Sequence, residues 1–340
     1  MRRLRRIALA LAIIIAVPLS LWAAMAIYFD SPIASIRTLA AILYLVVMLV
    51  AFFVLRRDHR WLVVVYAGGA LVVIWWLSIK PSNNGDWKPN HVKTAYANVN
   101  GDQVTIQNIR NCDYRTEFDY TCQWDTRSYS LANLRGADVF ITWWGSPWIA
   151  HPIVSFDFGD QGHVAMSIET REAVGQSYSA LRGFFRQYAL AYTVSDERDV
   201  IRLRTNYRKD EEVYLFRTTV DPPLARKLFL DYMQRVNDLH DRPEWYNALT
   251  NNCTTNIAVS IAEARDTRVR YDWRILLNGK MDGMLYEHNG LVTDGRSLPE
   301  LRQQAHINAA AKAAGASPDF SQLIREGRIG FAGSPQFLNR

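Results

Sequence analysis

A single cysteine, Cys253, stands among polar residues in the stretch 246–256, which reads YNALTNNCTTN. An apolar helical pattern follows at once, from Ile257 to Ala262. Asn251 or Asn252 can cap this helix, since a side-chain oxygen there accepts an amide hydrogen bond of the first turn. Cys253 would then lie at the positive end of the helix dipole, which favours thiolate over thiol.

This is where cysteine hydrolases and acyltransferases place their nucleophile. A buried cysteine that happens to begin a helix is the alternative. The polar residues expected to support a catalytic thiol are Asn251, Asn252, Thr254 and Asn256.

Two neighbouring strands carry histidines that could serve as the base for this thiol. One face of residues 151–158 is apolar, and the opposite face carries His151. Residues 163–169 alternate in the same way, with His163 and Glu169 opposite the apolar side. The tetrapeptide GDQG between the two strands predicts a hairpin turn.

The register of this hairpin decides which histidine meets the carboxylate. Both apolar faces are buried together only if even-numbered residues pair with even-numbered ones. The tightest such register closes a loop over residues 159–161 and sets Glu169 opposite His151, with Cβ atoms about 5 Å apart. His163 would sit at the turn, about 20 Å along the strand from Glu169. Cys253, His151 and Glu169 would then form a thiol triad, with His163 as the rival base.

Other site chemistries find no support in the sequence. Cys112 and Cys122 have no nearby histidine, so zinc-ligand spacing is missing, and no metal site is expected. Phosphate-binding glycine loops and a serine nucleophile elbow are also missing, and no cofactor is expected. His240 lies at the end of a predicted helix, where it would cap carbonyl groups.

Further elements must position these residues. Residues 138–144 predict a buried strand, 213–219 another, and Asp221-Pro222 begins an amphipathic helix that ends near His240. Charged residues separate apolar ones through 195–206, where solvated strand ends are the favoured interpretation and a salt-bridge network or headgroup-binding rim the other. Residues 309–316 predict an alanine-rich helix or a frayed tail, and no chemistry is expected after Arg265.

Three apolar runs fill the N-terminus, over residues 7–29, 39–55 and 61–79, and each is about long enough to cross a bilayer. Arginines precede the first run and fill the turn between the second and third. The positive-inside rule puts both arginine clusters in the cytoplasm. We therefore expect a bacterial inner-membrane protein with a cytoplasmic N-terminus and a periplasmic main domain after Lys80.

Charge and cysteine usage agree with this topology. Residues 1–80 hold nine Lys/Arg and two Asp/Glu, whereas the rest of the chain is close to neutral, so nucleic acid is not an expected partner. Cys112 and Cys122 lie in a polar, aromatic stretch, and an oxidising compartment would let them form a disulfide. Two unpaired buried cysteines are the alternative.

The stretch around Asn-Asn-Cys-Thr-Thr resembles the signature of the Lnb N-terminal periplasmic domain family. Further segments are similar to its proteobacterial branch: Ala150-His151, Ser167–Arg171, Phe184–Tyr188 and Asp196–Asp199. The resemblance covers roughly residues 104–264. The family's named member is a lipoprotein N-acyltransferase of Bacteroidetes that is thought to use a Cys–His pair in a papain-like arrangement.

Residue by residue, the resemblance carries the family's cysteine onto Cys253 and its strand histidine onto His151. Pro152 stands where the family usually has threonine. In papain-like enzymes the cysteine precedes the histidine and the orienting residue, so the order histidine, carboxylate, cysteine implies a circular permutation.

We therefore expect an α+β protein: three transmembrane helices (1–80), a linker (81–103), a permuted papain-like periplasmic domain with an antiparallel sheet (104–300) and a C-terminal tail (301–340). The expected function is cysteine-dependent acyl transfer of the lipoprotein N-acyltransferase kind. Its expected partners are the inner membrane, a lipid-linked acyl donor and a lipoprotein acceptor. A thiol peptidase or amidase acting on cell-wall peptide, and a non-catalytic periplasmic binding module, are the alternatives.

Overall fold

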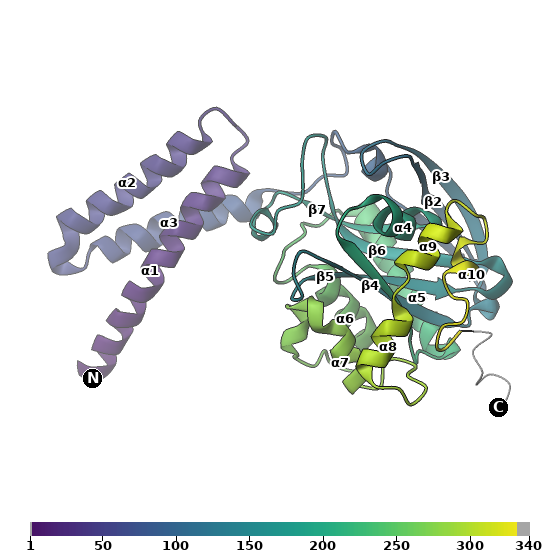
Figure 1. Cartoon of the computed structure of the whole chain (residues 1–340). Helices are drawn as coiled ribbons and strands as arrows, with labels where there is room; N and C mark the ends of the chain where they lie inside the picture. The colour runs from purple at the N-terminus through teal and green to yellow at the C-terminus, as the bar shows by residue number, and fades with distance from the viewer. Residues whose placement is uncertain (1, 332–340) are drawn as a thin grey trace. The chain divides into compact units, whose positions relative to one another are not determined.

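The computed structural model describes residues 2–331, which form two compact units. One unit comprises residues 2–82 together with 178–189, and the other comprises 83–177 together with 190–331. Figure 1 shows the long helices of the first unit in purple and blue, and the sheet and helices of the second in teal to yellow.

Each predicted apolar run forms one helix of the first unit: α1 (Arg2–Asp30), α2 (Arg37–Leu55) and α3 (Trp61–Ser78). All three are long and apolar enough to cross a membrane. Helices α1 and α3 approach closely at Gly69, where a Cβ atom would lie 2.9 Å from the Leu19 side chain. Small residues at such contacts let apolar helices pack backbone to backbone.

The second unit is built on an eight-stranded sheet in the order β1-β2-β7-β6-β5-β4-β8, with β3 paired to β2. Its strands are β1 (Tyr96–Asn100), β2 (Gln103–Tyr114), β3 (Tyr120–Ser130), β4 (Gly136–Trp144), β5 (Ala150–Asp157), β6 (His163–Arg171), β7 (Ala189–Ser195) and β8 (Glu211–Arg217). The sheet was expected to be antiparallel, but β2 and β7 pair in parallel, so it is mixed.

The predicted register of the β5–β6 hairpin is confirmed. Ile153 pairs with Ser167 and Asp157 with His163, around a single short turn over Gly159–Gln161. Extending this register by one further alternation sets His151 opposite Glu169. Burial of one apolar face is therefore sufficient to fix the pairing.

Helices cover both faces of the sheet: α4 (Glu197–Arg202), α5 (Pro222–Asp241), α6 (Cys253–Ala264), α7 (Met281–Glu287), α8 (Leu298–Ala305), α9 (Asn308–Ala314) and α10 (Phe320–Leu323). Phe156 of β5 and Phe158, just after this strand, pack edge-to-face on Phe229 of α5. On the opposite face Ile153 belongs to a core with residues of α4, α9 and α10. Asp221 caps α5 as predicted, accepting a hydrogen bond from the Leu224 amide.

Two segments outside the predicted domain bounds contribute to this unit. Strand β1 falls within residues 81–103 and extends the sheet beyond β2. In the C-terminal part, Ile307, Ala311 and Phe320 are fully buried against Phe140 and its neighbours. Their apolar side chains are too widely spaced along the sequence to stand out as one amphipathic helix.

The favoured interpretation of residues 195–206 as solvated strand ends is wrong. Residues 197–202 form helix α4, and 203–207 continue it as a π-helical turn. Glu197, Asp199 and Arg202 are each at most 3 % exposed. The other interpretation, a structural salt-bridge network, describes this segment, because Glu197 and Asp199 have buried partners from distant parts of the chain.

Candidate active site

Cys253 is the first residue of helix α6, as the sequence predicts. Asn252 is the cap, and its Oδ1 accepts hydrogen bonds from the amides of Thr254 and Thr255, each at 2.9 Å. Thr255 Oγ1 accepts in return from the Asn252 amide at 2.9 Å, which completes a capping box. Asn256 and Asn251, two of the predicted supporting residues, bond to one another at 2.8 Å. The polar stretch therefore holds the start of the helix rigid around the thiol.

Asn278 joins the thiol to the strand that carries His151. Its Nδ2 lies 3.8 Å from Cys253 Sγ and donates to Thr254 Oγ1 at 3.0 Å. Its Oδ1 accepts from the amide of Ala150 at 2.8 Å. One side-chain amide thus links the N-terminus of α6 to the residue immediately before His151.

His151 is oriented by a relay that runs through Ser167 to Glu169. His151 Nε2 lies 2.8 Å from Ser167 Oγ, which donates its own proton to Glu169 Oε1 at 2.7 Å. Because the hydroxyl proton is committed to the carboxylate, the hydroxyl oxygen accepts from Nε2–H. This tautomer leaves the lone pair of Nδ1 as the basic position of the ring.

Glu169 is ionised in this environment. Burial alone would raise its pKa, but Arg110, His151 and Arg204 outweigh burial and lower the pKa below its usual range. The guanidinium groups of Arg110 and Arg204 lie 3.7 Å and 3.6 Å from its carboxylate oxygens. A fixed negative charge therefore stands behind Ser167, where it stabilises positive charge on His151.

The predicted rival base, His163, lies elsewhere. Its Nε2 is 3.8 Å from Asp157 Oδ1 at the turn of the hairpin, and burial followed by the charge of Arg325 lowers its pKa. The hairpin therefore brings His151 and not His163 to Glu169. His240 does not cap carbonyl groups as predicted, because its Nδ1 lies 2.9 Å from Thr94 Oγ1.

The predicted thiolate does not agree with the environment of Cys253. Burial raises the pKa of the thiol, and the hydrogen bond with Thr254 offsets this only in part. Burial, followed by the charge of Arg204, lowers the pKa of His151 to about 3. Both groups are thus neutral at pH 7, which is the resting state of a general-base pair and not of a thiolate–imidazolium pair.

The neutral resting state predicts how Cys253 is alkylated. We expect the rate of Cys253 alkylation by iodoacetamide to rise about tenfold per pH unit between pH 7 and pH 9, since only the thiolate reacts. Mass spectrometry of the tryptic peptide that contains Cys253 gives this rate. A rate that is already constant at pH 6 would contradict the prediction and restore the ion pair.

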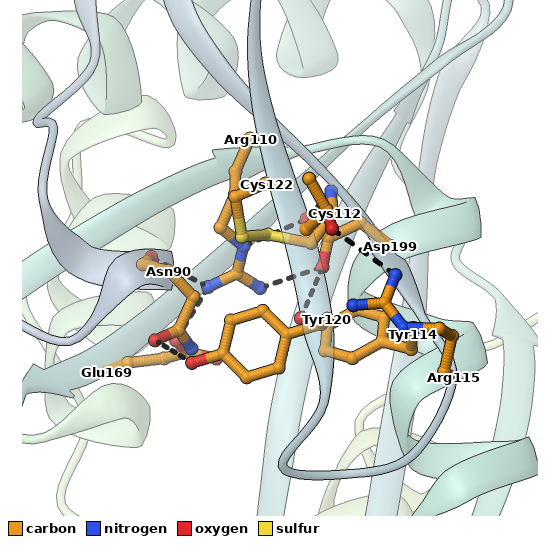
Figure 2. The surroundings of a disulfide bond; sticks show 10 residues. Asn90, Arg110, Cys112, Tyr114, Arg115, Tyr120, Cys122, Glu169 and Asp199 are labelled. Atoms are coloured by element: carbon orange, nitrogen blue, oxygen red, sulfur yellow. Dashed lines mark hydrogen bonds and ion pairs between the residues drawn. A yellow bond between two sulfur atoms is a disulfide. The ribbon is translucent and has the colours of Figure 1, made fainter.

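A disulfide joins Cys112 on β2 to Cys122 on β3, next to Arg110 (Figure 2). Arg110 pairs with Asp199 through Nε at 3.0 Å, and Asp199 also accepts from the Cys112 amide at 2.8 Å. Figure 2 shows the Arg110 guanidinium between Asp199 and Glu169. The disulfide, the aspartate and the arginine together fix one of the charges that keep Glu169 ionised.

Replacing both Cys112 and Cys122 by serine is expected to lower the free energy of unfolding by about 2–3 kcal/mol. A disulfide that closes a loop of this length constrains the unfolded chain by about that amount. The two cysteines are ten residues apart. Thermal unfolding of the detergent-solubilised chain would measure the loss. Reduced wild-type protein, which should match the double variant, is the control.

Gly279 holds Asn278 in place by close contact with another backbone segment. A Cβ atom at Gly279 would overlap the carbonyl carbon of Trp148 and the oxygen of Pro147. The Gly279 amide donates to Trp148 O at 2.9 Å, and Trp143 Nε1 donates to Gly279 O at 2.9 Å. An open groove of about 430 Å³ begins here, lined by Trp143, Trp144, Tyr214, Gly279, Lys280 and Arg302 among others.

We expect Gly279→Ala to separate Asn278 from the thiol, because backbone cannot yield as a flexible side chain does. Overpacking of this kind typically costs about 1–3 kcal/mol of stability. The rate of Cys253 alkylation should change as well, since the neighbouring side-chain amide of Asn278 moves. Gly283→Ala in α7 is the matched control, because its Cβ would meet only a Leu298 methyl group at 3.7 Å. Equal behaviour of the two variants would contradict this role of Gly279.

Sequence reasoning missed three residues of this site: Asn278, Ser167 as the relay, and Arg204. The Asn-Gly dipeptide at 278–279 was the available signal, because it marks a turn in which the backbone approaches closely. For residues 2–331, no cluster of three or more histidine, cysteine, aspartate or glutamate side chains could hold a metal ion.

Comparison with protein families gives a match over part of the chain. The family model of the Lnb N-terminal periplasmic domain matches residues 120–279. Comparisons with curated proteins and with solved structures found no match. His151, Glu169, Cys253 and Asn278 all lie in the matched range, so this part of the chain is similar to the Lnb N-terminal periplasmic domain family.

Proposed function

We propose that this chain is a membrane-anchored, periplasmic, cysteine-dependent acyl-transfer enzyme with a permuted papain-like site. One observation carries the proposal. Cys253, at a capped helix start, is linked through Asn278 to the strand of His151, whose ring is oriented by Ser167 and Glu169. A structural cysteine would not require a side-chain link to a strand whose histidine is oriented by a buried carboxylate.

In the proposed reaction, His151 Nδ1 takes the proton of Cys253 as Sγ attacks the carbonyl carbon of an ester or amide. The carbonyl π electrons move to oxygen and form a tetrahedral oxyanion. The oxyanion then collapses, the bond to the alcohol or amine breaks, and the leaving group takes the proton from His151. An acyl-thioester on Cys253 remains.

The second half of the reaction uses the same groups. His151 removes a proton from an incoming amine or water, which attacks the thioester carbonyl. Collapse of this intermediate releases the amide or acid, and the proton on His151 returns to the thiolate. Transfer to an amine and hydrolysis thus differ only in the second nucleophile.

Two kinds of donor are available for the oxyanion. The amide of Cys253 itself is one of the unpaired donors at the start of helix α6. The Asn278 Nδ2 group, 3.8 Å from Sγ, is the second donor that we propose. Since Asn278 is fixed by Ala150 and Thr254, it would meet the developing charge without reorganising.

The membrane helices set the substrate class that we propose. Three candidate spanning helices precede the domain, and the arginines at the N-terminus and at 56–60 favour a cytoplasmic N-terminus. The domain would then remain at the outer surface of the inner membrane. A lipid-linked acyl donor and a lipoprotein acceptor are the substrates that such a tether would present.

The test is to trap the acyl-enzyme. Full-length protein in detergent is incubated with a phospholipid that carries an alkyne-tagged fatty acyl chain, and the adduct is read by mass spectrometry. A hydroxylamine-sensitive acyl group on the peptide with Cys253 would support the proposal. If wild-type protein forms no such adduct with the lipid or with a tagged peptide ester, the proposal fails.

The groove beside the site favours one second candidate, a thiol peptidase or amidase. Its walls combine Trp143 and Trp144 with charged side chains of both signs, Glu212 and Lys280 among them, which suits a peptide better than an acyl chain. Release of a short cell-wall peptide, with no acyl adduct from lipid, would favour this candidate. A binding module without catalysis would give neither result.

A further inference from the structure

An exposed apolar surface borders the thiol site. Trp148 and Trp273 are 48 % and 47 % exposed, and Ile149, Leu276 and Leu277 are exposed to a similar extent. We call these five residues the apolar rim. Large side chains in contact with one another seldom remain in water without a partner, so such a patch marks an interaction surface.

The apolar rim is continuous in space although it comes from two parts of the chain. The rings of Trp148 and Trp273 lie 6.4 Å apart. The amides of Leu276 and Leu277 both bond to the carbonyl of Trp273, and Asn278 and Gly279 then return the chain to Ala150 and Trp148. Asn278 itself contacts Cys253, so the rim lies at the edge of the proposed active site.

Unpaired positive charge accompanies the apolar rim. Residues 265–280 contain five Arg and Lys against two Asp. Arg265, Arg268 and Arg270 are exposed, and none of them forms an ion pair with a described residue. Between and after these arginines stand two further exposed apolar residues, Val269 and Tyr271.

Lys280 completes the pattern, because its Nζ lies 5.0 Å from the centre of the Trp148 ring. Tryptophan beside lysine or arginine is typical of the membrane–water interface, where the ring lies at headgroup level and the cation meets phosphate. The alternation of cations with apolar side chains matches a bilayer surface in both hydrophobicity and charge.

We propose that the apolar rim, with Arg265, Arg268 and Arg270, docks the domain on the surface of a bilayer that contains anionic phospholipid. Such a surface would be close to the domain, since three helices apolar enough to cross a membrane are covalently joined to it. Each arginine near an anionic membrane contributes about 1 kcal/mol, or about fivefold in affinity. Docking would present the entrance of the thiol site to lipid, but it does not depend on thiol chemistry.

Photo-crosslinking of the full-length protein in nanodiscs tests this surface. The nanodiscs contain phosphatidylcholine with phosphatidylglycerol and a phospholipid that carries a diazirine near its carbonyl group. Adducts are expected in peptides 145–150 and 268–280, in addition to those in α1–α3. The membrane helices supply the internal reference for every yield.

Two variants separate the apolar and the electrostatic contributions. In Trp148→Ser/Trp273→Ser/Leu277→Ser the adducts of the domain should fall about tenfold relative to those of the helices. In Arg265→Gln/Arg268→Gln/Arg270→Gln they should fall at least tenfold, since three cations worth about fivefold each are removed, and lose their dependence on phosphatidylglycerol. Phe118→Ser is the matched control, because Phe118 is 88 % exposed in a turn far along the chain and should leave the yields unchanged.

The proposal is overturned if adducts occur only in α1–α3, or if adducts in 268–280 persist in both variants. Cys253→Ala should keep the adducts, since docking and catalysis are separate. The docking result thus stands or falls independently of acyl transfer.

Discussion

Acyl-enzyme formation should be undetectable in Cys253→Ala and about 10²–10⁴-fold slower in His151→Ala, the range over which general-base catalysis contributes. Alanine at 253 removes the only atom that could form the thioester. His151→Ala leaves a thiol whose pKa is raised by burial and removes the base that we propose for its proton. The rate of adduct formation from the tagged phospholipid, followed by mass spectrometry, measures both effects.

Variants of the relay should give intermediate losses. Ser167→Ala removes the hydroxyl between His151 Nε2 and Glu169 Oε1, atoms that are themselves 3.8 Å apart. Glu169→Gln keeps the shape but removes the negative charge that stabilises imidazolium. Because the three groups act in series, we expect His151→Ala/Glu169→Gln to be no slower than His151→Ala alone.

His163→Gln is the control for a histidine of similar burial on the same hairpin, and it should retain the wild-type rate if the protein remains folded. A thermal transition recorded on each variant separates misfolding from loss of chemistry. Loss of activity in His163→Gln, with His151→Ala unaffected, would move the base to the other end of the hairpin. Adducts that persist in Cys253→Ala would remove the thiol from the reaction.

The hairpin is predictable from sequence because its information is local. Strand alternation fixes which side chains share a face, and a short turn leaves a single compact register. His151 and Glu169 can therefore be paired from the amino-acid pattern alone. Cys253 stands out for a similar reason, since capping residues and helical periodicity lie within a few positions of it.

The remainder of the site depends on contacts between distant segments. Asn278 lies 25 residues after Cys253 and acts through a side-chain bond that no periodicity encodes. Arg204 and Arg110 reach Glu169 from a π-helical turn and from strand β2. The helix at 197–202 was not predicted, because its charged residues are typical of a solvated segment and their ion-pair partners lie far away in the sequence. Each of these is a tertiary effect that overrides the local pattern.

We expect the largest loss of stability when the buried charged network loses Arg325. Arg325 crosses from the C-terminal segment to two fully buried carboxylates. Its Nη2 lies 2.8 Å from Asp138 Oδ2 and 2.6 Å from Glu197 Oε1. Arg325→Met keeps much of the side-chain volume but leaves both carboxylates without this partner. The expected loss is about 3–5 kcal/mol in the free energy of unfolding, the range measured when one member of a buried pair is removed.

The pH dependence of this loss identifies its cause. In the wild type, burial alone would raise the pKa of Glu197, but Arg325 outweighs it and lowers the pKa to about 2. The stabilisation is thus complete above the unfolded value, near 4.5, and is lost as the pH falls toward 2. In Arg325→Met burial dominates, so the folded state takes up a proton that the unfolded state does not hold. The loss of unfolding free energy in this variant should therefore be smaller at pH 5 than at pH 8. Over the same range Glu197 changes the stability of the wild type little.

Thermal or denaturant unfolding at pH 8 and pH 5 distinguishes this from a packing effect. Arg325→Met/Glu197→Gln should recover part of the loss at pH 8, because it removes one of the stranded charges, and the double-mutant cycle measures the coupling. Arg296→Met, at an exposed arginine of the same C-terminal part, should stay within about 0.5 kcal/mol of the wild type. A deficit of Arg325→Met that is equal at both pH values would mean that lost packing, and not an unpaired charge, determines the stability of this core.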